Sequence, residues 1–435
     1  MQTAPKRVIN GWAMYDWANS VYNLVITTTF FPIYFTGVTK KYFGSDHIPF
    51  LGRTFVNSSL YDYTLAAAYL LVALSYPILT SIADTRGNKK DFMRVFCYLG
   101  ALGCSLIYFF NGANLWLGVL AFMMASMGYV GSLVFYNAYL PEIAAPEDRD
   151  RVSAKGYSYG YIGSVLMQII GFVLVILLKD DPDFLGPRIT FFLVGIWWIG
   201  FAQITFSRLP KTVPVETKRV NIFTDGFKEV KKVYSEVKTM PVLKRFLRGF
   251  FFYSMGVQTV MLAATLFGSK LLGLDDTKLI ITVVLIQLVA IIGAIMMSQL
   301  SARYGNFKVL MGVVIFWIFI CIAAYFTALY KEQGGNPEYH FYGLAIAVGI
   351  VMGGIQSLSR STYAKLMPET RDTASYFTYY DLTEKIAIVI GIFSFGFIEE
   401  KAGMKNSVLS LIVFFVAGFI LLYTALSKEK QLKQQ

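Results

Sequence analysis

Twelve apolar segments, each close to 20 residues long, dominate this chain. A helix of about 20 residues crosses the roughly 30 Å hydrocarbon core of a bilayer. Hydrophobic residues make up 56% of the 435 residues, which leaves too little polar surface for a water-soluble protein. We therefore predict an all-α, multi-pass membrane protein with twelve transmembrane helices. The expected spans are 11–36, 61–83, 92–110, 115–140, 152–178, 189–207, 246–272, 278–301, 307–329, 341–366, 374–398 and 406–426.

One short motif occurs twice in the chain. Residues 146–150 read PEDRD and are followed by Ser153, and residues 368–372 read PETRD and are followed by Ser375. Each copy follows the fourth apolar segment of its half, which predicts two six-helix bundles related by pseudo-twofold symmetry. The expected units are an N-terminal bundle at 1–207, a cytoplasmic linker with an amphipathic helix at 208–245, and a C-terminal bundle with a short tail at 246–435.

Positive charge predicts the orientation in the membrane. Most of the 39 lysines and arginines fall on the side that holds both termini, including the short loops 84–94 and 302–308. By the positive-inside rule both termini are expected to be cytoplasmic, in the cell (inner) membrane. The basic residues flank apolar spans, so anionic membrane lipids, and not nucleic acid, are the expected partners. We expect a monomer, and we interpret the linker as a connector on the cytoplasmic face, with a partner or lipid-sensing site as the alternative.

Cysteine and histidine positions argue against catalysis. Cys97, Cys104 and Cys321 lie inside expected spans, and His47 and His340 lie in outer loops. We therefore expect no disulfide, no metal site and no catalytic Cys-His pair. Glycine loops that bind phosphate are also missing, so we expect no cofactor and no enzymatic activity.

A polar stripe runs along the first apolar segment. Asp16, Asn19, Ser20, Asn23 and Thr27 recur at intervals of three and four residues, which places them on one face of a helix. An acid at mid-helix costs about 2.5–3.5 kcal/mol to insert, so it is a functional candidate by default. We expect Asp16 to line a cavity, and a structural acid that pairs with a neighbouring helix is the alternative.

The tenth and eleventh segments offer matching charges. Gln356 and Arg360 are one turn apart, and the guanidinium of Arg360 can present a planar fork to a carboxylate. Asp381 and Lys385 are spaced i to i+4, so they can neutralise each other on their own helix, whereas Glu384 has no partner at that spacing. The group of Asp381, Glu384 and Lys385 is therefore a proton site, a gate or a structural ion pair, and the three alternatives stay open.

Two short basic loops resemble a known signature. Residues 84–90 (DTRGNKK) and 302–308 (ARYGNFK) are similar to the cytoplasmic motif of the major facilitator superfamily, which Asp84, Gly87 and Lys89 match. An aspartate at this place can sit against the N-terminus of a helix in the other half and hold an inner gate shut. The alternative is a solvated turn in which the glycine permits the bend.

The chain as a whole resembles the autophagy-related vacuole-effluxer-like family of that superfamily. The resemblance is carried by residues 12–20 (WAMYDWANS), 135–141 (FYNAYLP) and 356–361 (QSLSRS). It implies two bundles that rock about a central cavity and a small zwitterion, such as an amino acid, as substrate. The seventh span departs from the family, because Met255 stands where an acidic residue is expected.

We therefore expect a secondary active transporter of a small polar solute, an amino acid or related zwitterion, that works by alternating access, with proton coupling left open. An exporter of larger amphipathic compounds and a non-transporting sensor or scaffold are the alternatives. The expected substrate ligands are Asp16, Asn19, Asn23, Tyr136, Asn137, Gln258, Gln356 and Arg360. The expected proton-coupling residues are Glu384, Asp16, Asp381 and Lys385. The expected gating residues are Asp84, Gly87, Lys89, Arg149, Arg303 and Arg371.

Overall fold

The computed structural model describes residues 2–210 and 222–434, and almost all of them are helical. The N-terminal part contains α1 (Lys6–Val21), the π-helix η1 (Tyr22–Phe30), α2 (Phe31–Phe43), α3 (Asn57–Arg86), α4 (Lys89–Ile107), α5 (Leu115–Ala138), α6 (Leu140–Ile143), α7 (Arg149–Leu177) and α8 (Leu185–Arg208). After α9 (Ile222–Thr239), the C-terminal part contains α10 (Pro241–Leu266), the π-helix η2 (Phe267–Leu271), α11 (Asp276–Tyr304), α12 (Asn306–Glu332), α13 (Glu338–Leu366), α14 (Thr373–Ala402) and α15 (Met404–Gln434).

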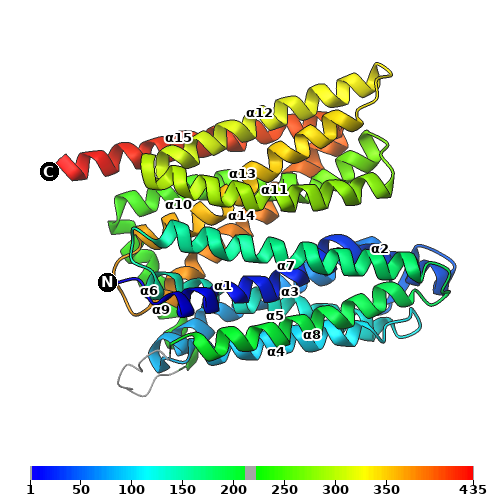
Figure 1. The fold of residues 1–435 in the computed structure, drawn as a ribbon, viewed down its shortest axis with the longest axis horizontal. Coiled ribbons are helices and arrows are strands. Elements are labelled where there is room, and N and C mark those ends of the chain that lie inside the picture. The colour runs from blue at the N-terminus through cyan, green and yellow to red at the C-terminus, as the bar shows by residue number, and fades with distance from the viewer. Residues whose placement is uncertain (1, 211–221, 435) are drawn as a thin grey trace.

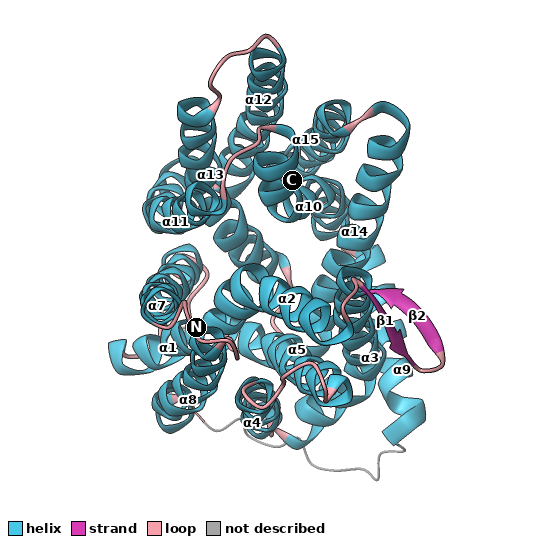
Figure 2. Ribbon diagram, turned by 90° about the vertical axis from the view of Figure 1, so that its right-hand side faces the viewer, coloured by secondary structure: helices cyan, strands magenta, loops and turns pink. Residues whose placement is uncertain are grey.

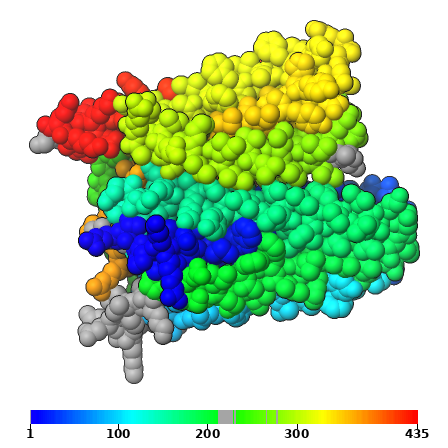
Figure 3. All heavy atoms as spheres, viewed as in Figure 1, coloured from blue at the N-terminus to red at the C-terminus, as the bar shows by residue number. Residues whose placement is uncertain are grey.

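The long helices lie side by side in two groups. Helices α1–α8 form the lower group in Figure 1 and helices α10–α15 form the upper group, with both termini at the same end of the molecule. Figure 2, which views the molecule from the end opposite the termini, shows the same division. Along the boundary, α7 of one group packs against α11 of the other, and this contact is visible in the space-filling view (Figure 3). The fold is thus an all-α membrane architecture, as predicted.

The helices extend past the expected apolar segments. The first runs over residues 6–43 where 11–36 was expected, because backbone hydrogen bonding continues into the polar flanks where apolar composition ends. Among the described residues, nine helices are long and apolar enough to cross a membrane. The segments expected at 92–110, 246–272 and 374–398 correspond to α4, α10 and α14, which lie outside that group. The count of twelve crossings therefore stays a prediction.

The first long helix is not a uniform α-helix. Between α1 and α2 it passes through the π-helix η1, and α10 likewise continues into the π-helix η2. A π-helix has more residues per turn, so it rotates the side chains that follow it relative to those before it. The α-helical spacing on which the polar stripe from Asp16 to Thr27 was predicted therefore changes from Tyr22 onward.

A short hairpin at the end opposite the termini was not expected from the sequence. Strand β1 (His47–Phe50) pairs with β2 (Arg53–Val56) in antiparallel register. The two-residue turn is Leu51-Gly52, with φ of 51° and 72°, which matches a type I′ turn. Apolar periodicity misses such a strand pair, because only Ile48 and Phe50 are buried.

Glycines set how closely α13 approaches α11. A Cβ atom on Gly353 would lie 2.0 Å from the carbonyl oxygen of Ala290, and one on Gly293 would lie 2.1 Å from that of Ile350. Only glycine allows backbones to come this close. The tight pairing of these helices positions the polar end of α13, which carries Arg360, against the other bundle.

The linker helix α9 lies at the end that holds the termini (Figure 1), and it packs against α3 and α14. Its Val233 and Val237 are buried. Lys232 lies 3.0 Å from Asp372, and Tyr376 donates a hydrogen bond of 2.5 Å to Glu236. The apolar face predicted for the first half of this helix falls on side chains outside the described residues.

Candidate functional site

An ion pair joins the two bundles in the interior of the molecule. Asp16 of α1 and Arg360 of α13 lie 3.4 Å apart, and their side chains are only 8% and 3% exposed. The two residues are more than 300 positions apart in the chain and belong to different bundles. The structure therefore brings together the acid and the base that the sequence analysis singled out independently.

The Arg360 guanidinium is completely hydrogen-bonded. Nε donates to Ser153 Oγ at 2.9 Å, and Nη2 donates to the Ser153 carbonyl at 2.9 Å and to Asp16 at 3.4 Å. Nη1 donates to Asp16 at 3.4 Å and to Asn137 Oδ1 at 3.3 Å. These contacts use all five N–H groups of an arginine side chain.

Aromatic rings enclose the same pair. The guanidinium carbon lies 4.3 Å from the ring centre of Tyr157 and 4.9 Å from that of Trp12, distances at which cation–π attraction is effective. Tyr136 donates a hydrogen bond of 2.7 Å to Asp16 and stacks on Trp12 with ring centres 4.5 Å apart. The pair is thus dry, and no bonding capacity of the guanidinium is left over in this conformation.

A glycine makes room for this pair. A Cβ atom on Gly156 of α7 would lie 2.5 Å from Asp16 Oδ2 and 2.9 Å from Arg360 Nη2. This space follows from how α7 packs against α1 and α13, so no local sequence pattern locates it. Glycine at this position is a geometric requirement of the ion pair.

A second charged group lies on α14. Glu384 and Lys385 are 3.5 Å apart, and Gln258 of α10 donates a hydrogen bond of 3.2 Å to Glu384. The Lys385 ammonium also lies 5.5 Å from the ring centre of Tyr69 on α3. Lys385 is hydrogen-bonded to its neighbour Glu384, and it also interacts electrostatically with Asp381, the partner that the spacing suggested, although no hydrogen bond joins those two among the described residues.

Asp381 instead connects α14 to the other bundle. Its carboxylate lies 3.1 Å from the hydroxyl of Tyr76 on α3, and the residue is buried. One turn closer to the termini, Thr378 donates a hydrogen bond of 3.0 Å to Thr80. This edge of α14 is therefore held against α3 by a row of side-chain contacts.

Asp84 continues that row at the start of α14. Its carboxylate accepts hydrogen bonds from the backbone N–H groups of Ala374 and Ser375, at 3.2 and 2.8 Å, and from Ser375 Oγ at 2.8 Å. These N–H groups belong to the first turn of α14, where the helix dipole favours negative charge. Lys89 lies 3.1 Å from the same carboxylate.

Further contacts surround Asp84 at this end. Lys89 lies 2.5 Å from Glu142 and donates to Thr373 Oγ1 at 2.6 Å. Arg149 donates to the carbonyl oxygen of Ala364 in the other bundle at 2.6 Å. Charged residues of the N-terminal bundle therefore bind backbone and hydroxyl groups of the C-terminal bundle at the end that holds both termini.

The other bundle contributes a related contact that the sequence analysis missed. Asn306 stands in the second of the two similar basic loops at the place that Asn88 holds in the first, and it is the first residue of α12. It donates a hydrogen bond of 2.7 Å to Asp150, which also pairs with Lys365 at 2.6 Å. The carboxylate therefore belongs to the first turn of α7 and the amide to the first turn of α12. The repeated motif at 146–150, which contains Asp150, was the available signal for this contact.

The side chains of the remaining candidates lie apart from these contacts. Gln356 and Asn23 are partly exposed, whereas Asn19 is buried and its side-chain amide has no hydrogen-bond partner among the described residues. Arg303 and Arg371 are exposed, with Arg303 over the ring of its neighbour Tyr304, while the backbone carbonyl of Arg371 accepts a hydrogen bond of 3.3 Å from Lys89. Gly87 ends α3 with a φ of 63°, a conformation that favours glycine.

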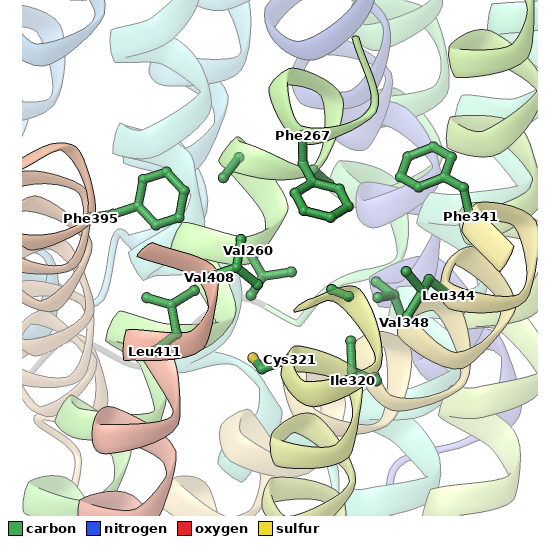
Figure 4. A pocket seen from close by; sticks show the side chains of 13 residues that line it. Val260, Phe267, Ile320, Cys321, Phe341, Leu344, Val348, Phe395, Val408 and Leu411 are labelled. Carbon is green, nitrogen blue, oxygen red and sulfur yellow. The ribbon is translucent and has the colours of Figure 1, made fainter. Parts of the chain in front are cut away.

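The structure also contains an apolar cavity within the C-terminal bundle. Phe267, Phe341 and Phe395 line it together with Cys321 and Leu411, from α10, η2 and α12–α15 (Figure 4). It contains no residue of the N-terminal bundle, so it is separate from the charged boundary. Within the described part of the chain, no cluster of three or more His, Cys, Asp or Glu residues could hold a metal ion.

Comparisons with known proteins identify the family of this chain. The family described as "Vacuole effluxer Atg22 like" matches residues 4–435. The chain is 30% identical to the uncharacterized MFS-type transporter YxiO of Bacillus subtilis (strain 168), over 95% of this chain and 93% of YxiO. It is 22% identical to autophagy-related protein 22 of Kluyveromyces lactis (strain ATCC 8585 and its equivalents), over 98% of this chain and 94% of that protein.

The fold has solved counterparts. The human organic anion transporter MFSD10 superposes with a TM-score of 0.73 at 13% identity, covering 96% of this chain and all of that one. At this identity the likeness concerns the fold alone, and it is the fold of major facilitator transporters. With the family match spanning nearly its whole length, the chain belongs to the vacuole effluxer Atg22-like family of the major facilitator superfamily.

Proposed function

We propose that this protein is a secondary active transporter in which 1–207 rocks against 246–435 about a central site. The observation that carries this proposal is the set of ionic and hydrogen-bonded contacts between the bundles, which runs from Asp84 at one end to the Asp16–Arg360 pair in the interior. Contacts of this kind bias a two-state equilibrium if they form in only one state. In the proposed cycle they form when access from the end with the termini is closed.

The orientation is part of the proposal. Both termini, and with them the interlocked end, face the cytoplasm, as the distribution of lysine and arginine favours. Asp84, Lys89 and Arg149 then act as an inner gate, with Gly87 shaping the loop. Exposed Arg303 and Arg371 contribute surface charge facing anionic lipid, and not gate contacts. The protein acts as a monomer in the cell membrane.

The proposed substrate is a small zwitterion such as an amino acid, moved outward. Membership of a family named for vacuole effluxers supports export. The proposed role of the Asp16–Arg360 pair is a central latch, since each charge is satisfied by protein while the inner end is closed. Asn137 and Tyr136 hold the latch, and Asn19, Asn23 and Gln356 flank the path. Asp381, which accepts a hydrogen bond from Tyr76 and lies near Lys385, is the proposed proton carrier.

Counterflow in proteoliposomes tests the proposal. Vesicles loaded with unlabelled amino acids should accumulate a mixture of ¹⁴C-labelled L-amino acids, and a pH gradient should change the rate if protons are coupled. Protein-free vesicles serve as the negative control. Binding of the labelled mixture without any accumulation, in protein shown to be folded, would instead identify a sensor on a transporter fold.

A further inference from the structure

Resting on the proposed function, we infer that Glu384 and Lys385 form the site that binds the two charged groups of an amino-acid zwitterion. The carboxylate of the substrate would pair with the Lys385 ammonium, and its ammonium would pair with the Glu384 carboxylate. This assigns recognition of the substrate to α14, whereas Asp16 and Arg360 lock the bundles together.

Depth and exposure distinguish the two ion pairs. The Glu384 and Lys385 side chains are 15% and 18% exposed, compared with 8% and 3% for Asp16 and Arg360. Glu384 lies 11 residues after the start of α14 at Thr373, which corresponds to about 17 Å along the helix axis and so to mid-membrane depth. The Glu384–Lys385 pair is therefore less tightly packed than the Asp16–Arg360 pair, at a depth where lipid alone would make charged groups costly.

The Glu384–Lys385 pair also leaves bonding capacity unused. Residues i and i+1 of a helix point about 100° apart, so neighbours cannot form an ideal ion pair. Among the described residues, the Lys385 ammonium, which has three N–H donors, is hydrogen-bonded to Glu384 alone, at the long distance of 3.5 Å. By contrast, all five donors of Arg360 are occupied. A ligand can therefore add bonds at α14 without first breaking the latch.

The surroundings of the pair fit a ligand that contacts both bundles. Tyr69 comes from α3 of the N-terminal bundle, and Gln258 comes from α10 of the C-terminal bundle. An amide beside the carboxylate and an aromatic ring beside the ammonium add directed contacts to the two charges. A zwitterion carries no net charge, so its binding beside Asp381, Glu384 and Lys385 leaves the charge balance in the membrane interior unchanged.

The same helix provides matched control residues. Glu400 and Lys401 are also adjacent, 3.9 Å apart, but their side chains are 75% and 66% exposed near the far end of α14. We therefore compare Glu384→Gln and Lys385→Gln with Glu400→Gln and Lys401→Gln in counterflow of the ¹⁴C-labelled L-amino-acid mixture. Loss of one charged hydrogen bond predicts an increase in KM of about tenfold to hundredfold in the first two variants and no change in the controls.

Competition on the unmodified protein gives a second readout that does not depend on how the variants fold. Excess amino-acid amides, which lack the carboxylate, and carboxylic acids, which lack the ammonium, should inhibit the wild type at least tenfold more weakly than intact amino acids. In Glu384→Gln, which cannot pair with an ammonium, the carboxylic acids should inhibit about as strongly as intact amino acids. In Lys385→Gln, which cannot pair with a carboxylate, the amides should inhibit about as strongly as intact amino acids. A purely structural role of the pair would not produce such a reciprocal change.

The outcomes separate this inference from the proposed function. If the wild type shows no counterflow of the labelled mixture, the proposed function fails. If the wild type transports the mixture, but both variants keep its KM and its inhibition pattern, the transporter stands and the assignment of Glu384 and Lys385 is overturned. Equal inhibition of the wild type by amides, acids and intact amino acids would also overturn it.

Discussion

Replacing Asp84 with asparagine should open the cytoplasmic end of the protein. The carboxylate of Asp84 holds the first turn of α14 through two backbone N–H groups and Ser375 Oγ, and it pairs with Lys89. Asparagine is nearly the same size but removes the charge and one of the two acceptor oxygens. Since these contacts join the two bundles, the substitution weakens the closed state and leaves an open state unaffected.

The size of the effect follows from the charge and the acceptor oxygen that asparagine removes. Hydrogen bonds to a charged group contribute about 1.5–3 kcal/mol, and a carboxylate at a helix N-terminus contributes about 0.3–1 kcal/mol through the dipole. Asparagine retains part of the hydrogen bonding, so we expect a net loss of about 2 kcal/mol in closed-state stability. At about 1.4 kcal/mol per factor of ten, the open population should rise roughly 30-fold.

Cysteine labelling measures this population. Thr378 is fully buried between the bundles, hydrogen-bonded to Thr80, so a Thr378→Cys thiol should react with a membrane-impermeant maleimide only when the inner end opens. The native Cys97, Cys104 and Cys321 are buried within single bundles and supply a low background. In inside-out vesicles the labelling rate of Thr378→Cys should rise roughly 30-fold on adding Asp84→Asn.

Arg303→Gln provides the matched control, because Arg303 is exposed at the corresponding loop of the other repeat. It should leave the labelling rate unchanged. An equal rate with and without Asp84→Asn would refute the reasoning, since it would mean that the Asp84 contacts do not differ between the two states.

Three further predictions follow from single contacts. Arg360→Ala leaves the Asp16 carboxylate buried without its partner and should lower the free energy of unfolding by about 3–5 kcal/mol. In a protein that already carries Asp16→Asn, the same substitution should cost much less. Strictly additive losses in the double mutant would contradict this. Gly353→Ala should lower the free energy of unfolding, measured with heat or denaturant, by about 1–3 kcal/mol, because its Cβ would lie 2.0 Å from the Ala290 carbonyl oxygen. Gly343 lies on the same helix with open space around it, so Gly343→Ala should not lower the free energy of unfolding. Asp372→Asn removes a half-exposed ion pair with Lys232 worth less than about 1 kcal/mol, so the labelling rate of Thr378→Cys should change by less than about fivefold.

The sequence alone predicted the architecture well. Apolar length and the repeated PEDRD and PETRD motifs indicated a helical membrane protein made of two related halves, and the family and fold comparisons confirm that class. Composition carries this information because lipid forces the backbone into helices of a set length. Helix ends were less predictable, because polar residues at the ends of a helix carry no signal of where hydrogen bonding stops.

Individual partners were harder to predict than candidate residues. Asp16, Arg360 and Asp84 stand out in the sequence because charge within or beside an apolar span is costly. Their partners depend on packing between distant segments, which is why Gly156 beside the ion pair and Asp150 beside Asn306 were not foreseen. The π-helix η1 was also missed, since a stripe of polar residues at α-helical spacing gives no warning of a change in helix type.

Cross-linking of the two bundles tests alternating access most directly. The hydroxyl oxygens of Thr80 and Thr378 lie 3.0 Å apart across the boundary, so a Thr80→Cys/Thr378→Cys pair is placed to form a disulfide. Alternating access predicts that oxidation abolishes counterflow of the labelled L-amino-acid mixture and that a reducing agent restores it. Undiminished counterflow in fully cross-linked protein would show that the bundles need not separate at this end, and it would contradict the proposed mechanism.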